Sequence, residues 1–374
     1  MKITNVKVDM FNWKTEAWKT GVGTTFGDTR QLGIVTVETD EGVSGNAFLG
    51  SSRMGADHFV KGMMEFIKPI VMGRNPQDIG AIWWEMWKMN RSVSTYIIGA
   101  IDICLWDIAG KALNVPIWKL LGGKHRDMIP VYASSMRRDL TPLEEGRRAA
   151  GLVEQGYSAY KLHSALPGAI DHPSDETIPT VTEVRAAVGD DVDILVDVNG
   201  SYSVHHSIEI GKALEDLGVF HFEEPRPAHD LEGLAQIADA LTIPIASGEM
   251  IYTHHQYRDL ILQGKVDIIQ PDIVKVPGFT EFQKIDALAS AFGVPITVHN
   301  TQPILSTVAH LHFCAASSMV PYKQEYNIEP ISIRDEWPVL KEPLQVIDGH
   351  IAVPNGPGLG VELDDEVLKT LSER

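Results

Sequence analysis

The chain has 374 residues, of which 44% are apolar and 22% are charged, and its formal charge at pH 7 is −18. These values are typical of a globular protein long enough for two domains. The negative charge argues against nucleic acids and anionic membranes as partners, and no apolar run approaches the roughly 20 residues that span a membrane. The N-terminal run MKITNVKVDMFNW lacks the apolar centre of a secretion signal, so we expect a cytoplasmic protein.

Residues 1 to about 55 have the pattern of a β unit. Apolar and polar residues alternate in ITNVKVDMF, LGIVTVETDEG and VSGNAFLG, and an Asp-Glu-Gly turn separates the last two runs. The Gly- and Thr-rich stretch from Trp13 to Arg30 predicts a loop between the first two strands. Residues 56–122 have helical periodicity that stops at Gly122 and Gly123. We therefore predict an α+β N-terminal domain over residues 1–125.

From about residue 128 the pattern changes, and short apolar runs alternate with helical segments. Such units in series predict parallel strands joined by crossover helices, in a TIM-type barrel of seven or eight β/α units over residues 126–344. Residues 345–374 return to a hairpin pattern, and we expect them to fold back onto the N-terminal domain and complete it. The eight apolar runs are MIPVYAS, AYKLHS, DILVDVNG, VFHFEEP, PIASGE, VDIIQPDI, PITVHN and YKQEY.

Nearly every predicted strand ends in a charged or metal-binding residue, at the end where barrel enzymes keep their sites. Asp197, Glu223 and Glu249 come from three successive strands, and 26 residues separate each from the next. Three carboxylates that meet would repel one another without a cation, and hard oxygen ligands without nearby thiols indicate Mg²⁺ or Mn²⁺. The alternative, that the acids cap helices at the surface, explains any one of them more readily than all three.

Two further pairs of polar residues lie at predicted strand ends. Alternation places Lys161 and His163 on the same side of one strand, where each depresses the proton affinity of the other and favours a neutral base. Asp272 and His299 end neighbouring strands, and an Asp can fix the tautomer of a His for acid–base catalysis. The alternatives are a solvated Lys with a core His, and a structural His that caps a helix. Lone histidines such as His310 are not proposed as site residues.

Together these residues resemble the enolase superfamily and, within it, the mandelate racemase subgroup. The resemblance covers essentially the whole chain. AIDICLWDIAGKALNVPIWKLLGG is similar to the capping-domain helix and linker of that family, so the N-terminal domain is expected to cap the barrel. VDVN, FEEP and SGE are similar to its three metal-ligand strands, and QPDIVK followed by VHN is similar to its Asp–His dyad.

The resemblance implies a role for each matching residue. Asp197, Glu223 and Glu249 would bind one Mg²⁺ per subunit, or Mn²⁺ in its place. His299 would be an acid–base catalyst supported by Asp272. Lys161 matches the lysine that contacts the substrate carboxylate. Glu325 matches the strand-eight acid that hydrogen-bonds the enediolate, and Asn199 matches a polar partner near the metal.

The chain departs from the family at the second strand. The common pattern there is Lys-x-Lys with the second lysine as base, whereas this chain has His163, so either His163 or Lys161 can be the base. The muconate-lactonising and dipeptide-epimerase subgroups fit less well, because they place a catalytic lysine on the sixth strand, although Lys275 leaves that interpretation open.

Substrate specificity is expected to come from loops. We expect the stretch from Ser164 to Thr177 to reach over the mouth of the barrel. The loop that begins at Trp13 is expected to cover the site; the alternative is a surface loop without contacts. Candidate substrate contacts in the capping domain are Trp18, Lys19, Phe26 and Arg53.

The predicted chemistry is removal of the proton α to the carboxylate of a small-molecule substrate, giving an enediolate. Our main hypothesis is β-elimination of water from an acid sugar, which yields a 2-keto-3-deoxy acid. The alternatives are racemisation or epimerisation of a hydroxy acid and cycloisomerisation of a lactone. A non-catalytic metal-binding scaffold is a more distant alternative, since it would not need Lys161, His299 and Glu325 together. The resemblance also implies a homo-oligomer, either an octamer or a dimer.

Overall fold

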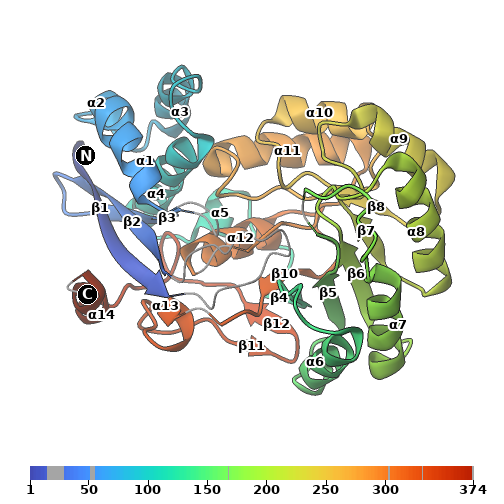
Figure 1. Ribbon diagram of the computed structural model, residues 1–374. Coiled ribbons are helices and arrows are strands. Elements are labelled where there is room, and N and C mark those ends of the chain that lie inside the picture. The colour runs from blue at the N-terminus through green and yellow to red at the C-terminus, as the bar shows by residue number, and fades with distance from the viewer. Residues whose placement is uncertain (15–28, 51–54, 167, 302–303, 331, 373–374) are drawn as a thin grey trace.

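The structure is a computed structural model, and it describes residues 1–374 except 15–28, 51–54, 167, 302–303, 331 and 373–374. The N-terminal domain begins with an antiparallel sheet in the order β1-β2-β3 (Figure 1). Ile3, Val6 and Phe11 of β1 are buried in the core of this domain. The strands are β1 (Ile3–Lys14), β2 (Thr29–Thr39) and β3 (Ser44–Leu49).

Helices follow this sheet and pack against it. The longest is α4 (Thr95–Leu113), which Ser94 caps at its start and which ends at Asn114 in the left-handed conformation. Almost every residue in the middle of α4 is buried, because the helix lies between the sheet and the barrel. The other helices are α1 (Asp57–Gly62), the π-helix η1 (Met63–Ile67), α2 (Lys68–Val71), α3 (Ile79–Trp87) and α5 (Ile117–Leu120).

The second unit is the predicted barrel. Its strands are parallel in the order β4-β5-β6-β7-β8-β9, and β10 pairs with β4 and closes the ring. Ile296, in the seventh predicted run, forms only an isolated parallel bridge to Ile269, so seven of the eight runs form full strands. The strands are β4 (Met128–Ser134), β5 (Ala159–His163), β6 (Asp193–Asp197), β7 (His221–Glu223), β8 (Ile245–Ser247), β9 (Ile268–Ile269) and β10 (Gln324–Asn327).

Within the described residues, the helices from α6 to α12 surround the barrel (Figure 1). Two of them begin with capping boxes, Thr141 with Glu144 and Thr253 with Gln256, which fix where the chain leaves the mouth of the barrel. The helices are α6 (Pro142–Glu154), α7 (Thr177–Val188), α8 (Val204–Asp216), α9 (Leu231–Ala240), α10 (His254–Leu262), α11 (Gly278–Phe292) and α12 (Leu305–Ala316).

The C-terminal segment contacts both units. The hairpin β11 (Val346–Ile347) and β12 (His350–Ala352) pairs with the first half of β4, which is a barrel strand. The last helix, α14 (Asp365–Ser372), lies against β1 of the N-terminal domain, and the short α13 (Ser332–Asp335) also contacts β1. The boundaries 1–125, 126–344 and 345–374 stay predictions. Among the described helices, none combines the length and apolarity that a membrane crossing requires.

Candidate active site

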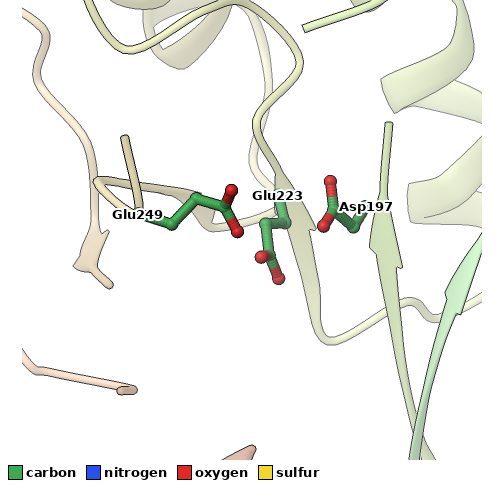
Figure 2. A group of neighbouring side chains, drawn as sticks. All are labelled: Asp197, Glu223 and Glu249. Atoms are coloured by element: carbon green, nitrogen blue, oxygen red, sulfur yellow. The ribbon is translucent and has the colours of Figure 1, made fainter. Parts of the chain in front are cut away.

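The three predicted metal ligands meet at the carboxyl ends of the central barrel strands. Asp197 ends β6, Glu223 ends β7, and Glu249 follows β8 by two residues. One carboxylate oxygen from each lies within 4.8 Å of the others, and all three side chains are buried. Figure 2 shows Glu223 between the other two carboxylates. The equal spacing in the sequence therefore corresponds to a real cluster in space.

Lys161 is the central cation of the site. Its Nζ lies 2.8 Å from Glu223 Oε1, 2.8 Å from Glu325 Oε1 and 3.6 Å from Asp197 Oδ2. Burial alone would lower the pKa of Lys161, but the carboxylates of Glu223 and Glu325 outweigh it and raise that pKa well above its usual value. Lys161 is therefore held in its charged form at neutral pH.

His163 lies beside Lys161 on β5, as the alternation predicted. Its Nδ1 is 2.6 Å from the carbonyl oxygen of Ser135, which can only accept a hydrogen bond, so Nδ1 carries a proton. The other ring nitrogen, Nε2, lies 2.9 Å from Asp197 Oδ2. The nitrogen that can accept or release a proton therefore faces the carboxylate cluster.

Asp272 and His299 form the predicted dyad on the opposite side of the cluster. Asp272 Oδ2 lies 2.8 Å from His299 Nδ1, and His299 Nε2 lies 2.7 Å from Glu249 Oε2. Burial opposes a charge on His299, but the Glu249 carboxylate outweighs it and raises the pKa of His299 to about 10. Asp272 thus fixes the orientation of the ring, and Nε2 points into the site.

His310 lies behind this dyad, and no sequence pattern singles it out as a site residue. The Ile273 amide donates to His310 Nε2 at 3.0 Å, while Nδ1 lies 2.9 Å from the Ser306 carbonyl oxygen and so carries the proton. Nε2 is 3.7 Å from Asp272 Oδ1. Burial lowers the pKa of His310 to about 4, which keeps it neutral.

Glu325 completes the ring of site residues from β10. It accepts hydrogen bonds from Ser134 Oγ and from the Asn300 amide, both at 2.7 Å, in addition to its contact with Lys161. Burial would raise the pKa of Glu325, but Lys161 outweighs it, and the pKa falls to about 2. Glu325 is therefore an anion that fixes Lys161.

Asn199 and Glu224 follow two of the metal-ligand strands in the left-handed conformation, with φ of 44° and 42°. The Asn199 amide donates to Asp197 Oδ1 at 2.8 Å, and Arg138 donates to the Asn199 side-chain oxygen. Glu224 is buried beside the cluster, and burial together with Glu249 raises its pKa. Asn199 therefore orients the Asp197 carboxylate, and Glu224, the second acid of FEEP, adds a fourth carboxyl group beside the triad.

Lys275 is the second buried cation of the site. Its Nζ lies 3.3 Å from Glu249 Oε1, so Lys275 and His299 contact the two oxygens of the same carboxylate. Burial would lower the pKa of Lys275, but Glu249 and Asp272 outweigh it and raise that pKa. A Lys–His pair therefore flanks the cluster on each side.

The donor set fits a hard divalent cation. Glu223 Oε2 and Glu224 Oε1 are buried and accept no hydrogen bond within the described part of the chain. Buried carboxylate oxygens without partners are costly, and a cation bound by Asp197, Glu223 and Glu249 would stabilise them. The triad could therefore hold a metal ion.

The loops predicted to contact the substrate are described only in part. Trp18, Lys19, Phe26 and Arg53 lie outside the described residues. Within the stretch from Ser164 to Thr177, the Asp171 carboxylate accepts from the Ser203 amide, and Asp175 accepts from the Tyr202 hydroxyl. This stretch is thus fixed to the segment that follows β6.

Comparison with known families matches both units. Residues 3–122 match the mandelate racemase / muconate lactonizing enzyme N-terminal domain, and residues 144–367 match the enolase C-terminal domain-like family. Among curated proteins, the arabinonate dehydratase of Saccharolobus solfataricus is 31% identical and the match covers 89% of this chain and 88% of that protein. The D-galactarolactone cycloisomerase of Agrobacterium fabrum is 30% identical over 98% of each chain.

Solved structures agree with this assignment. A racemase from Streptomyces coelicolor with bound magnesium superposes with a TM-score of 0.87, at 25% identity, over 99% of each chain. Because the two family matches together span most of the sequence and the relatives are similar over nearly their whole length, the likeness is not confined to one domain. The chain belongs to the enolase superfamily, in its mandelate racemase and muconate lactonizing enzyme family.

Proposed function

We propose that this protein is a Mg²⁺-dependent acid-sugar dehydratase, a hydro-lyase that converts an acid sugar into a 2-keto-3-deoxy acid. The observation that carries the proposal is the pair of proton-transfer groups on opposite sides of one carboxylate triad. His163 faces Asp197, and the Asp272–His299 dyad faces Glu249. The curated relatives include dehydratases of arabinonate, D-gluconate and D-xylonate, which supports the choice of reaction.

The metal would be one Mg²⁺ per subunit, held by Asp197, Glu223 and Glu249. When bound, it would supply positive charge that stabilises the enediolate formed from the substrate carboxylate. Lys161 would add a second positive charge, because its raised pKa keeps it protonated. Two cationic groups would therefore offset the cost of forming a dianion from a weakly acidic α carbon.

Proton removal would be the task of His163. Lys161 is held as a cation by two carboxylates. His163 donates from Nδ1 to the Ser135 carbonyl, and its Nε2, which faces Asp197, would accept the α proton when it carries no proton of its own. The α C–H bond would break, with its electron pair passing to the carboxylate and its proton to His163. His299 would then donate the proton on Nε2 to the β hydroxyl, and the C–O bond would break to release water as the electron pair of the enediolate forms the Cα–Cβ double bond. The enol produced would tautomerise to the 2-keto-3-deoxy acid.

The test is proton NMR of the purified protein with Mg²⁺ in D₂O across a library of mono- and diacid sugars. Loss of one sugar with formation of a 2-keto-3-deoxy acid is the expected result. Deuterium entering the α position without loss of water would replace the dehydratase proposal with a racemase or epimerase. No reaction with any member would contradict an acid-sugar substrate.

Lactone cycloisomerisation is the second candidate. It is favoured by the similarity to the D-galactarolactone cycloisomerase, which extends over 98% of both chains. The same set of residues could remove an α proton and protonate a ring oxygen as it leaves. Adding sugar lactones to the NMR library separates the two functions, because ring opening or rearrangement without release of water identifies a cycloisomerase.

We also propose that the protein is a homo-oligomer, an octamer or a dimer. Light scattering coupled to size-exclusion chromatography gives the mass directly, and the subunit mass is 41.2 kDa. A single peak at the subunit mass would contradict this proposal without affecting the proposed chemistry.

A further inference from the structure

The barrel segment from Lys275 to Thr280 is held by the capping domain. It begins three residues after Asp272 and leads into α11, and three of its residues form hydrogen bonds with side chains of α3 and α4. The bonds are Thr95 Oγ1 to the Lys275 carbonyl at 2.7 Å, Trp83 Nε1 to the Pro277 carbonyl at 2.8 Å, Trp106 Nε1 to Thr280 Oγ1 at 3.2 Å, and Thr280 N and Oγ1 to Asp102 at 3.0 and 2.6 Å.

The two backbones also approach closely at this point. A Cβ at Gly99 of α4 would lie 2.8 Å from the Val276 carbonyl oxygen and 3.0 Å from the Gly278 amide nitrogen. Gly278 itself has φ of +76°, and a Cβ there would lie 2.4 Å from Asp102 Oδ2. The segment therefore has little freedom to shift relative to α4.

Lys275 connects this contact to the metal triad. Its carbonyl accepts the Thr95 hydrogen bond, while its ammonium reaches Glu249 Oε1 at 3.3 Å, and the side chain is almost fully buried. His299 lies against the other oxygen of Glu249. A carboxylate contacted on both oxygens has few orientations available, and its orientation decides how well it can ligate a cation.

We propose that Thr95 is a positioning residue for the metal site, through which the capping domain holds Lys275 and, by way of Lys275, sets the orientation of Glu249. This inference rests on the proposed role of Glu249 as a metal ligand. It assigns to the capping domain a part in assembling the metal site, in addition to its expected contacts with the substrate.

The position of the Lys275 backbone determines where its side chain can place the ammonium group. A buried lysine has several rotatable bonds, and its ammonium meets one partner reliably only when its backbone is fixed. The Thr95 hydroxyl fixes the backbone carbonyl of Lys275. Loss of this hydroxyl would also leave that partly buried carbonyl without its hydrogen-bond partner. Greater freedom of the Lys275 backbone would then allow the Glu249 carboxylate to change its orientation.

The test is the affinity for Mg²⁺ alone, measured by isothermal titration calorimetry on the full-length protein. Lys275→Met removes both the contact to Glu249 and one positive charge beside the triad, so it serves as the background in which the Thr95→Val effect is compared with its effect in the wild type. Thr95→Val keeps the shape of the side chain and removes only the hydroxyl, and it should weaken binding by roughly three- to tenfold. In the double variant, the Thr95→Val effect should disappear, because its path to Glu249 is gone.

Trp106→Phe is the matched control. It removes another hydrogen bond between α4 and the same segment, at Thr280, so it should lower stability while leaving the Mg²⁺ dissociation constant within about twofold. If Thr95→Val and Trp106→Phe weaken Mg²⁺ binding equally, or if Thr95→Val leaves it unchanged, the proposal is wrong. Failure of the wild-type protein to bind Mg²⁺ would instead contradict the proposed function.

Discussion

At the scale of single residues, the site is a cluster of acids with a Lys–His pair on each side. Lys161 and His163 contact Asp197 and Glu223, and the second pair, Lys275 with His299, contacts Glu249. Each pair thus joins a fixed cation to a group that can exchange a proton. In the proposed mechanism, this arrangement would provide an acid and a base on opposite faces of the substrate.

His299→Asn tests the dyad. The amide cannot transfer the proton, so we expect turnover to fall by about 10²- to 10⁴-fold. Mg²⁺ binding should persist, because all three carboxylates remain. Turnover is measured by NMR with the substrate found in the library, and Mg²⁺ binding by calorimetry. Unchanged turnover in this variant would remove the dyad from the mechanism.

Residues on strands were predictable from the sequence, whereas residues on turns and helices were not. Asp197 ends β6, Glu325 lies in β10 and His299 belongs to the seventh apolar run, so the barrel pattern indicated that they converge. Lys275 lies on a turn three residues after Asp272, where alternation no longer tells which way a side chain points. His310 lies on α12, and its contact with Asp272 depends on how that helix packs against the barrel.

At the scale of elements, close contact between α4 and the barrel depends on Gly99. Alanine normally stabilises a helix relative to glycine by up to about 1 kcal/mol. At Gly99 the added methyl would meet backbone atoms of Val276 and Gly278, so we expect Gly99→Ala to lower the free energy of unfolding despite the gain in helix propensity. Urea unfolding measures the change.

Gly151 provides the control for this prediction. It lies inside α6, and a Cβ there would meet nothing within 4 Å. Gly151→Ala should therefore raise the free energy of unfolding by roughly 0.5–1 kcal/mol. Stabilisation of both variants would mean that α4 can move away from the barrel at little cost.

Helix α12 carries a buried histidine that makes stability depend on pH. His312 accepts from the Trp118 amide through Nδ1 and donates through Nε2 to the Leu359 carbonyl, so it must be neutral. Burial lowers the pKa of His312 to about 4, compared with 6.5 when unfolded. The unfolded state therefore binds the proton first, and the stabilisation present above pH 6.5 is lost as the pH falls toward 4.

We expect the titration of His312 to lower the free energy of unfolding by about 2 kcal/mol between pH 7 and pH 5. His312→Gln removes the titrating group, so the difference in unfolding free energy between wild type and variant should shrink over that range. Urea unfolding at pH 7 and pH 5 measures it. A difference that is the same at both pH values would show that His312 is not held neutral.

The regular elements followed closely from local sequence, whereas the exceptions depend on contacts between distant parts of the chain. The seventh predicted run, PITVHN, forms only an isolated bridge at Ile296, because the Val298 amide bonds to the side chain of Gln324 and not to a neighbouring strand. The C-terminal hairpin was predicted as a hairpin, but pairing of Ile351 with Ile129 of β4 depends on contacts that no local pattern encodes.

At the scale of the whole molecule, a protein with a formal charge of −18 must bind an anion. The field of the surface opposes this, and the buried cations Lys161 and Lys275 act against it within the site. The same cations neutralise much of the charge of the triad, so the fold should not depend on the metal.

Removal of metal with EDTA tests this balance. We expect the circular dichroism spectrum to be unchanged and Tm to fall by less than about 10 °C, the size of a ligand-linkage effect at a hundredfold excess over the dissociation constant. Addition of Mg²⁺ should restore Tm, whereas Na⁺ at the same ionic strength should not. Unfolding in EDTA would show that the cations do not compensate the triad.

The partners of β4 determine when the barrel can be completed during synthesis. Met128–Pro130 pair with β12, and residues 131–134 pair with β10, so the first barrel strand waits for parts of the chain made nearly two hundred residues later. The sheet β1-β2-β3 and α4 leave the ribosome long before then. A nascent chain that stops before residue 324 therefore carries an open barrel with an unpaired strand edge, which makes it a substrate for chaperones until the last segment is released.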